Sequence, residues 1–318
     1  QQPEMKPEDD IAVIQYTGGT TGVPKGAMLT HANLSINAQQ IASYDPKMQY
    51  GVEKMLGALP LFHVFAMTVV LNTSVRIGAE VILQPKFELE KAMRAIAHKK
   101  LTLVPGVPTM YNAMLHHPRI DKYDLSSIRL SISGGAPLPV EMKKQFEALT
   151  GATLREGYGL TETSAVVAVN PYYGEAKEGS VGLPVPGTKI VICDQDHPEK
   201  VLPIGETGEI CIIGPQVMKG YWQKPEASAE TLINGRLRTG DIGYMNEEGY
   251  TFIVDRAKDL ILVGGFNVYP RQIEEAIYQH PAVKEVTVIG IADDYHGEVP
   301  KAFLVLEDGA ALTSEELR

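Results

Sequence analysis

Strand-like and helix-like hydrophobic patterns alternate along the chain between residues 11 and 159. The strand-like runs are IAVIQYT (11–17), MLGALP (55–60), EVIL (80–83), LTLVPG (101–106), IRLSISGG (128–135) and TLREGYG (153–159). The helix-like segments between them are 31–43, 63–76, 89–100, 108–117 and 138–149. Such alternation is typical of a parallel sheet whose two faces are covered by helices. We therefore expect an α/β fold with a mostly parallel sheet covered by helices.

The pattern changes after about residue 179. Helix-like segments vanish up to residue 254, and short apolar runs are separated by turn signals such as PIGETG and NEEGY. Closely spaced short strands with glycine- and proline-rich turns are typical of a small barrel or distorted sheet. The sequence therefore predicts a β-rich subdomain at about 179–254.

The last sixty residues change character again. A helix-like segment, PRQIEEAIYQH (270–280), precedes two strand-like runs, EVTVIGIAD (285–293) and KAFLVLED (301–308). We expect 1–257 to form part of a large domain that includes the β-rich subdomain. Residues 258–318 are expected to form a small α+β domain that is incomplete (truncated) at its C-terminal end.

The charge balance limits the partners of the chain. The formal net charge is −10, which argues against non-specific nucleic-acid binding and against a polybasic membrane anchor. The longest apolar-leaning run, residues 63–83, contains Asn72, Arg76 and Glu80 and is too polar for a membrane-spanning helix. Cys193 and Cys211 lie in strand-like runs, which favours buried thiols in a reducing compartment and leaves a disulfide as the alternative.

The stretch YTGGTTGVPKG, residues 16–26, contains many glycines and threonines around a single cation, Lys25. Glycines let the backbone approach a ligand, and successive amides form a nest that binds anions. We expect a strand–loop–helix arrangement that also offers a helix N-terminus to the ligand. Because Pro24 directly precedes Lys25, the stretch does not fit a Walker A loop. The alternative is a flexible turn with a solvated lysine.

The same stretch resembles the phosphate-binding signature of the adenylate-forming superfamily, which comprises acyl-CoA synthetases, luciferases and peptide-synthetase adenylation domains. Further stretches match the family in the same order. They are LPLFHVFA (59–66), SGGAPL (133–138), EGYGLTET (156–163), RTGDIG (238–243) and VDRAKDLILVGGFNVYPRQIE (254–274). Together these matches span nearly the whole chain, so a chance similarity is excluded.

The resemblance implies a site for ATP and Mg²⁺. The loop would hold the β- and γ-phosphates, with Lys25 following the departing pyrophosphate; its other implied contacts are Thr17, Gly18, Gly19, Thr20, Thr21 and Gly22. Tyr158 would stack on adenine, Thr161 would contact the α-phosphate and Glu162 would ligate Mg²⁺, with Thr17 as a second metal contact. The backbone that lines the adenine would come from Gly134, Gly135, Ala136, Pro137, Glu156, Gly157 and Gly159. Read alone, Glu162 is an ordinary exposed loop carboxylate.

The resemblance also implies roles for residues nearer the C-terminus. Asp241 would accept the two ribose hydroxyls, since a carboxylate offers two acceptor oxygens, and Arg256 would lie near the ribose and phosphate. Lys258 matches the residue about which the small domain rotates between two reactions. Gly264 and Gly265 would line the passage for the pantetheine of CoA. The alternatives are a surface arginine and a simple glycine turn.

His63, in LFHVFAM, matches the family position beside the carboxylate-binding end of the acyl pocket. A histidine among apolar residues is more often part of a core, and that alternative stays open. The apolar residues of 61–71 and 106–114 fit either an acyl channel or ordinary core, and periodicity does not separate the two.

Within the superfamily the motifs are most similar to those of bacterial long-chain fatty acid–CoA ligases. The resemblance implies a ligase that makes acyl-AMP from a fatty acid and ATP and then transfers the acyl group to CoA. The alternatives are an aryl or coumarate-type CoA ligase and a non-catalytic nucleotide- or acyl-binding module. An adenylation domain that loads a carrier protein is disfavoured because no carrier motif is present. A cytoplasmic location is expected, and peripheral association with the inner membrane and a homodimer stay open.

The chain also departs from the family pattern. It lacks the N-terminal part of the large domain and a PKTxxGK-like segment with the C-terminal lysine that neutralises the acyl-phosphate. We expect the chain alone to adenylate poorly or not at all, while nucleotide binding is compatible with the residues present.

Overall fold

The computed structural model describes residues 4–17, 24–264, 266–293, 295–307, 309–313 and 316. The chain divides into two compact units, which are described separately. Unit 1 comprises residues 1–191, 211–238 and 248–251, and unit 2 comprises 192–210, 239–247 and 252–318. Among the described residues no helix is both long and apolar enough to cross a membrane.

Unit 1 is built on a parallel sheet. Strands β3 (Lys54–Gly57) and β4 (Glu80–Leu83) pair in parallel, as do β5 (Leu130–Ser133) and β6 (Thr153–Tyr158). Leu103 lies between the two pairs and bridges Met55 and Leu130 in parallel. The predicted strand over 101–106 therefore fills the centre of the sheet, although it makes only single bridges. Two short antiparallel strands, β7 (Ala168–Val169) and β8 (Leu183–Pro184), extend it beyond β6.

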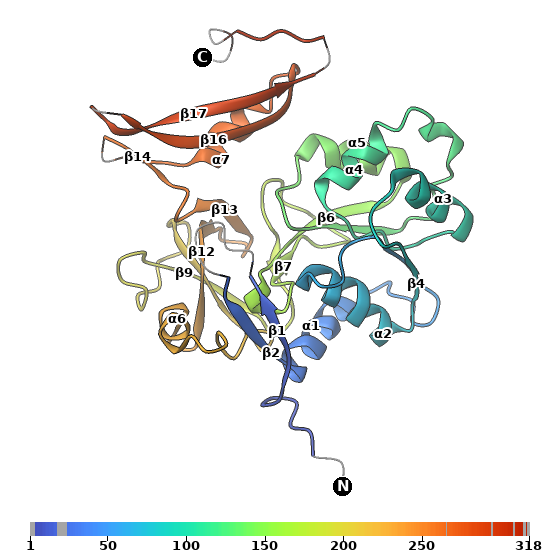
Figure 1. Ribbon diagram of the computed structural model, residues 1–318, viewed down its shortest axis with the longest axis horizontal. Coiled ribbons are helices and arrows are strands. Elements are labelled where there is room, and N and C mark those ends of the chain that lie inside the picture. The colour runs from blue at the N-terminus through green and yellow to red at the C-terminus, as the bar shows by residue number, and fades with distance from the viewer. Residues whose placement is uncertain are drawn as a thin grey trace. The chain divides into compact units, whose positions relative to one another are not determined.

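Helices cover both faces of this sheet, as the sequence pattern predicts. One group is α3 (Leu89–Lys99), α4 (Pro108–Leu115) and α5 (Val140–Thr150); the other is α1 (His31–Tyr44), the π-helix η1 (Ala66–Asn72) and α2 (Thr73–Ile77). Figure 1 shows the two groups on opposite sides of β4 and β6. Alternate residues of a strand point to opposite faces. Met55 accordingly lines a cavity against α1 and η1, and Leu56 packs in the core under α3 and α4.

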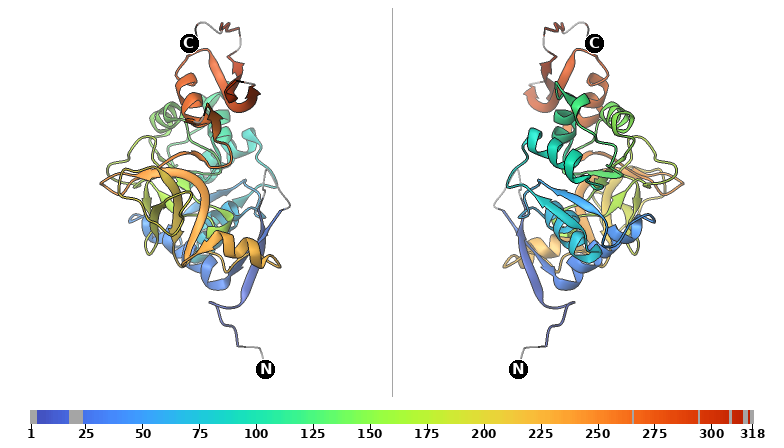
Figure 2. Two further views of the ribbon diagram at one scale, coloured as in Figure 1. Left: turned by 90° about the vertical axis from the view of Figure 1, so that its left-hand side faces the viewer. Right: turned by 90° about the vertical axis from the view of Figure 1, so that its right-hand side faces the viewer.

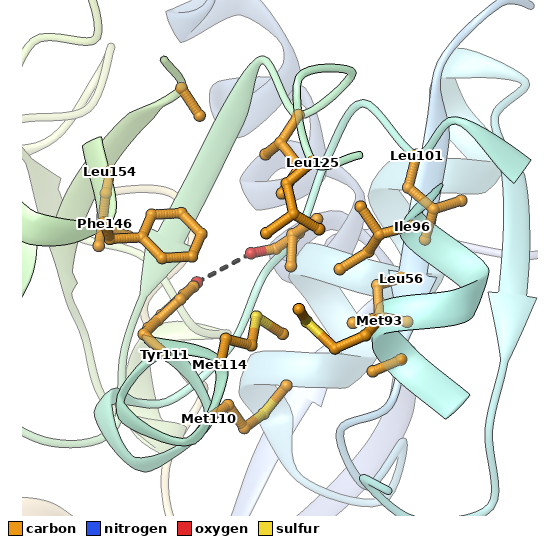
Figure 3. Packing of buried hydrophobic residues seen from close by; sticks show 14 of the residues in the cluster. Leu56, Met93, Ile96, Leu101, Met110, Tyr111, Met114, Leu125, Phe146 and Leu154 are labelled. Atoms are coloured by element: carbon orange, nitrogen blue, oxygen red, sulfur yellow. Dashed lines mark hydrogen bonds between the residues drawn. The ribbon is translucent and has the colours of Figure 1, made fainter. Parts of the chain in front are cut away.

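The main core lies under α3, α4 and α5 and is drawn in Figure 3. Tyr111 is fully buried at its centre, meets Phe146 edge to face at 5.0 Å, and donates its hydroxyl to the carbonyl of Val104. Met110 and Met114 are buried in the same cluster. Met110, Tyr111 and Met114 are therefore core, whereas Val107 is only partly buried.

The opposite face contains a small apolar cavity of about 20 Å³, lined by Ile41 and Val69 among others. This volume holds about one water molecule, so the cavity is far too small for an acyl chain.

The glycine-rich stretch joins two strands rather than a strand and a helix. β1 (Ile11–Tyr16) and β2 (Gly26–Thr30) form an antiparallel hairpin, whose strands lie side by side in Figures 1 and 2. Helix α1 begins only at His31, where Thr30 and Asn33 form a reciprocal capping box. The prediction that a helix N-terminus follows the loop is therefore wrong: the alternation of GAMLT suits a strand that pairs with β1.

Two further helical segments differ from the sequence prediction. Residues 66–72 form a π-helix within the segment expected as an α-helix; Thr73 Oγ1 donates to the carbonyl of Thr68, and Thr68 Oγ1 donates to that of Ser164. Helix α6 (Pro225–Thr231) lies in the region where no helix was expected. It has no buried residue, so it lacks the apolar stripe from which a helix can be predicted.

A five-stranded sheet occupies the region predicted to be rich in strands. Its order is β11 (Leu232–Ile233), β12 (Arg236–Met245), β10 (Gly208–Ile213) and β9 (Lys189–Cys193), and β13 (Thr251–Arg256) pairs with β12. Cys193 and Cys211 are buried thiols on β9 and β10, as expected.

Unit 2 contains a four-stranded sheet in the order β15 (Phe266–Val268), β14 (Ile261–Val263), β17 (Gly297–Leu306) and β16 (Val283–Asp293). The long antiparallel hairpin of β16 and β17 stands out in Figure 1. Helix α7 (Pro270–Ile277) packs on β16, and Glu274 Oε1 accepts a hydrogen bond from the Val288 amide at 2.7 Å. The helix and the two strands predicted here are confirmed.

Candidate functional site

Three side chains from separate parts of unit 1 meet beside the base of the glycine-rich loop. The ammonium of Lys25 lies 5.0 Å from the ring centroid of Tyr221, and the Tyr221 hydroxyl donates to Oε1 of Glu162 at 2.7 Å. A cation over a tyrosine ring at this distance is attracted by the ring face. Burial, followed by the nearby Glu162 carboxylate, raises the pKa of Tyr221, so its hydroxyl stays a donor at neutral pH.

Backbone pairing fixes Tyr221 next to the loop. Tyr221 bridges Ala27 of β2, and the Trp222 amide donates to the carbonyl of Gly26 at 2.7 Å. At the base of the loop the Thr17 amide donates to the carbonyl of Lys25 at 2.9 Å. Thr17 and Lys25 therefore lie together at the end of the β1–β2 hairpin. Gly18, Gly19, Thr20, Thr21 and Gly22 lie outside the described residues.

The two segments predicted to line adenine are neighbours at one edge of the parallel sheet. Ser133, which ends β5, pairs with Glu156 of β6, so SGGAP and EGYG run on from adjacent strands. Ligands of open α/β sheets bind beyond the carboxyl ends of the strands. Gly135, Ala136 and Pro137 are exposed there, whereas Tyr158 is buried.

The local geometry favours glycine at three of these positions. Gly135 has a φ of +79°, which suits glycine, and Gly134 is approached by the ring of Phe65, whose Cζ would lie 3.1 Å from an added Cβ. Gly157 would bring a Cβ to 3.3 Å from Ile132 Cγ2.

The segment that carries Glu162 is strained. Glu162 lies in a short 3₁₀ turn, Thr161–Thr163, and the two residues after it have positive φ: 60° at Ser164 and 136° at Ala165. Such conformations in residues other than glycine persist only where the surroundings fix them, and they cluster at functional sites.

Buried polar side chains fix this strained segment. The carboxamide of Asn37, on α1, donates to the carbonyl of Val166 at 2.7 Å and accepts from its amide at 3.0 Å. Ser164 Oγ donates to the carbonyl of Gln216, and the carbonyl of Glu162 accepts from the Met218 amide. The network therefore joins α1, the Glu162 turn and the segment that leads to Tyr221.

His63 lies in an exposed loop, so the reading of this residue as a core histidine is wrong. Its Nδ1 accepts from the Phe65 amide at 3.2 Å, and the Gln15 side chain of β1 donates to the neighbouring Phe62 carbonyl. Partial desolvation lowers the pKa of His63 below 6.5. The imidazole is therefore neutral at pH 7, and it can lie beside an anion without first taking up a proton.

The His63 ring is expected to titrate with a midpoint below 6.5, because the surrounding loop disfavours its charged form. The chemical shifts of the ring protons followed from pH 5 to pH 8 measure the midpoint. A midpoint at or above 6.5 would contradict the packing of this loop.

The predicted ribose residues lie together in unit 2. The side chain of Asp241 on β12 is 10% exposed, and its Oδ1 lies 3.5 Å from Nε of Arg256 at the end of β13, which is 58% exposed. The Asp241 amide donates to Oγ1 of Thr239 at 3.0 Å. Asp241 and Arg256 thus form one polar site, and its convergence with Lys25 and Glu162 stays a prediction.

The residues predicted to serve the domain rotation and CoA are also in unit 2. Lys258 is exposed in the turn after β13. Gly264 is exposed with a φ of +57°, and its amide donates to the carbonyl of His296 at 2.7 Å. Gly265 lies outside the described residues.

Sequence reasoning did not identify Tyr221 or Asn37. Tyr221 lies in MKGYWQ, where nothing in the local pattern distinguishes it from other surface-turn aromatics. Asn37 could have been identified from a sequence pattern, because Asn33, Asn37 and Gln40 recur at helical spacing. All three lie on the buried side of α1. Polar residues repeated along one helical face usually indicate a solvated face, and here that face contacts Val166 and the 215–217 segment.

Family models match nearly the whole chain. The model described as AMP-binding enzyme matches residues 1–222, and the model described as AMP-binding enzyme C-terminal domain matches residues 272–318.

Three known proteins illustrate the similarity. A long-chain-fatty-acid–CoA ligase of Bacillus subtilis (strain 168) is 51% identical over 99% of this chain and 56% of its own length. A feruloyl-CoA synthase of Amycolatopsis sp. is 40% identical over 97% of this chain and 62% of its own length. The crystal structure of ATP-bound MatB from Rhodopseudomonas palustris superposes with a TM-score of 0.90 at 37% identity, covering 98% of this chain and 61% of that one.

The chain thus spans a little over half of the length of the curated relatives it matches. The matched models cover both its α/β part and its C-terminal strands. The chain belongs to the AMP-binding enzyme family of adenylate-forming enzymes.

Proposed function

We propose that the protein is an AMP-forming fatty acid–CoA ligase. A fatty acid carboxylate attacks the α-phosphorus of ATP, which forms acyl-AMP and releases pyrophosphate. The CoA thiol then attacks the acyl carbon, loses its proton, and displaces AMP to leave a thioester. The observation that carries the proposal is the cluster of Lys25, Tyr221 and Glu162 beside the glycine-rich loop, in a chain 51% identical to a long-chain-fatty-acid–CoA ligase.

The chemistry explains why such a cluster is needed. A free carboxylate is a poor acyl donor because its leaving group would be oxide, and the mixed anhydride with AMP supplies a good one. The carboxylate must, however, approach a triphosphate that carries several negative charges. A lysine and donors aimed at the phosphates reduce this repulsion in a partly desolvated site. Lys25 meets this need at the mouth of the β1–β2 hairpin.

The residues present fit a magnesium ion that arrives with the nucleotide. Among the described residues no three His, Cys, Asp or Glu side chains gather to hold a metal. Mg²⁺ bound to a nucleotide commonly uses one or two carboxylates together with phosphates and waters. A carboxylate has about four acceptor positions, so the bond from Tyr221 leaves Glu162 able to bind the ion. Bound Mg²⁺ would neutralise phosphate charge, and Thr17 is a second proposed contact.

The remaining nucleotide contacts are part of the same proposal. Tyr158 stacks on adenine, Thr161 contacts the α-phosphate, and Asp241 accepts the ribose hydroxyls with Arg256 beside it. The 3.5 Å approach of Arg256 to Asp241 supports this pairing, since a guanidinium at this distance helps to orient the carboxylate. His63, which is neutral and exposed, is proposed as the contact to the substrate carboxylate.

The second reaction uses the small domain. We propose that 1–257 belongs to the large domain and that 258–318 rotates about Lys258 to bring Gly264 and Gly265 to the CoA passage. A rotation lets one site serve two reactions in turn. Lys258 is exposed in a turn between β13 and β14, which supports a hinge there.

The substrate class is tested by adenylate analogues that resist hydrolysis. We expect the chain to bind palmitoyl-adenosine sulfamate at least tenfold more tightly than AMP and than the feruloyl analogue. A tenfold gain needs about 1.4 kcal/mol, which burial of roughly two methylenes supplies. Isothermal titration calorimetry measures the three affinities.

The outcomes separate the candidate functions. Tighter binding of the feruloyl analogue would assign an aryl acid as substrate, the candidate that the 40% identical feruloyl-CoA synthase favours. Equal affinities for AMP and both analogues would indicate a nucleotide-binding module. Failure to bind AMP, ATP or any analogue would overturn the proposal.

A further inference from the structure

We propose that Tyr221 is a positioning residue of the nucleotide site: its hydroxyl orients the Glu162 carboxylate and its ring face holds the Lys25 ammonium. The inference rests on the proposed function and adds a residue to it. Lys25, Glu162 and Tyr221 are far apart in sequence and meet in unit 1. Lys25, which would meet the nucleotide, and Glu162, which would bind its cation, thus share one neutral partner, Tyr221.

The hydroxyl contact restricts the Glu162 side chain. Oε1 of Glu162 accepts from Tyr221 at 2.7 Å, a short bond of the kind that a charged acceptor makes. The backbone of Glu162 is fixed separately, through its carbonyl and the Met218 amide. With both ends fixed, the second carboxylate oxygen has a defined direction before any cation arrives, which reduces the entropy lost on binding.

The ring contact restricts Lys25. A lysine side chain loses much rotamer freedom when it is ordered. A ring face beneath the ammonium offsets part of that loss without neutralising the charge. The tyrosine therefore keeps the cation available for phosphate.

Tyr221 itself is rigidly held, as a positioning residue must be. It is 6% exposed, its amide donates to Oγ of Ser228 at 2.8 Å, and it bridges Ala27 of the loop's own strand. Ser228 Oγ in turn donates to the carbonyl of Lys224. The aromatic side chain has only two rotatable bonds, so the fixed backbone determines where its hydroxyl lies.

Tyr221→Phe tests the hydroxyl alone, because the ring is retained. ATP affinity is measured by calorimetry with Mg²⁺ and with EDTA, and the ratio of the two gives the gain that Mg²⁺ produces. We expect this gain to fall about tenfold, as for loss of a hydrogen bond to a charged group. The affinity in EDTA is expected to stay within twofold of the unchanged chain.

Tyr250→Phe is the matched control. Tyr250 is 7% exposed in the same unit, and its hydroxyl donates to the carbonyl of Glu175 at 2.8 Å, which involves none of the three site residues. The Mg²⁺-dependent gain of this variant is expected to equal that of the unchanged chain. Tyr221→Leu removes the ring as well, and its affinity for ATP in EDTA is expected to fall about two- to fivefold.

The results distinguish the two proposals. An unchanged chain that does not bind ATP overturns the proposed function and this inference with it. An unchanged chain that gains affinity with Mg²⁺, together with an equal gain in Tyr221→Phe, overturns this inference alone. Equal losses in Tyr221→Phe and Tyr250→Phe would also overturn it, because they would show a general effect of losing a buried hydroxyl.

Discussion

Replacing Arg129 with methionine is expected to lower the free energy of unfolding by about 3–5 kcal/mol, the usual effect of removing one partner from a buried ion pair. Arg129 directly precedes β5. Its Nη1 donates to Asp45 at 2.7 Å and to the Tyr173 hydroxyl at 3.0 Å, and its Nη2 donates to Glu53. The carboxylates of Asp45 and Glu53 are 0% and 2% exposed. The substitution would leave both without their cation.

The positions of these carboxylates explain why the loss of Arg129 would destabilise several elements of unit 1. Asp45 caps the C-terminal end of α1, and Glu53 directly precedes β3, where it also accepts from the hydroxyl of Thr102. Arg129 therefore ties α1 and two segments of the parallel sheet together. Urea denaturation followed by circular dichroism gives the free energy of unfolding.

Two control variants isolate the uncompensated charge. Arg129→Met combined with Asp45→Asn and Glu53→Gln is expected to recover most of the loss, because no buried charge then lacks a partner. Lys100→Met breaks the Lys100–Asp124 pair, whose side chains are 55% and 54% exposed, and is expected to have a far smaller effect. A single Arg129→Met variant as stable as Lys100→Met would show that the buried cluster does not contribute as the structure indicates.

Local hydrophobic period was enough to predict the parallel sheet and its helices. The helices expected over 31–43 and 89–100, for example, are α1 and α3, because the burial of one face leaves a repeat of 3.6 residues in the sequence. The same reasoning failed for elements whose formation does not depend on burying an apolar face. Helix α6 buries no residue, and β2 pairs with β1 through a loop whose glycines suggested a helix N-terminus.

Only those residues of the candidate site that lie in recognisable motifs could be predicted from the sequence. Lys25, Glu162 and the SGGAP and EGYG turns could be named because glycine, lysine and carboxylate patterns have recognisable chemistry. Tyr221 could not be named, since its role depends on a bridge to Ala27 across nearly two hundred residues of sequence. Long-range pairings of this kind leave no local signal.

Gly159→Ala is expected to destabilise the protein by about 3 kcal/mol or more and to abolish the gain in ATP affinity that Mg²⁺ produces. A Cβ built on Gly159 would lie 1.4 Å from the carbonyl oxygen of Ala165, which is backbone and has no rotamer to change. Overpacking against rigid groups commonly costs 1–3 kcal/mol and occasionally more. Ala165 already has a φ of 136°, so the strained turn that carries Glu162 would have to rearrange.

Gly157→Ala, two residues earlier, provides the comparison for this prediction. Its Cβ would come close to the Cγ2 methyl of Ile132, at 3.3 Å, and that side chain can shift by a few tenths of an ångström; the carbonyl oxygen of Ser133 would lie at 3.8 Å, an ordinary van der Waals distance. Thermal unfolding should therefore show a much larger decrease for Gly159→Ala than for Gly157→Ala, and calorimetry should show the Mg²⁺ effect lost only in the former. If both variants unfolded at the same temperature and responded equally to Mg²⁺, the close approach of residues 159 and 165 would not be what fixes Glu162. Because the clash involves backbone alone, the expected loss of stability depends on the strained turn itself and on no assumption about the substrate.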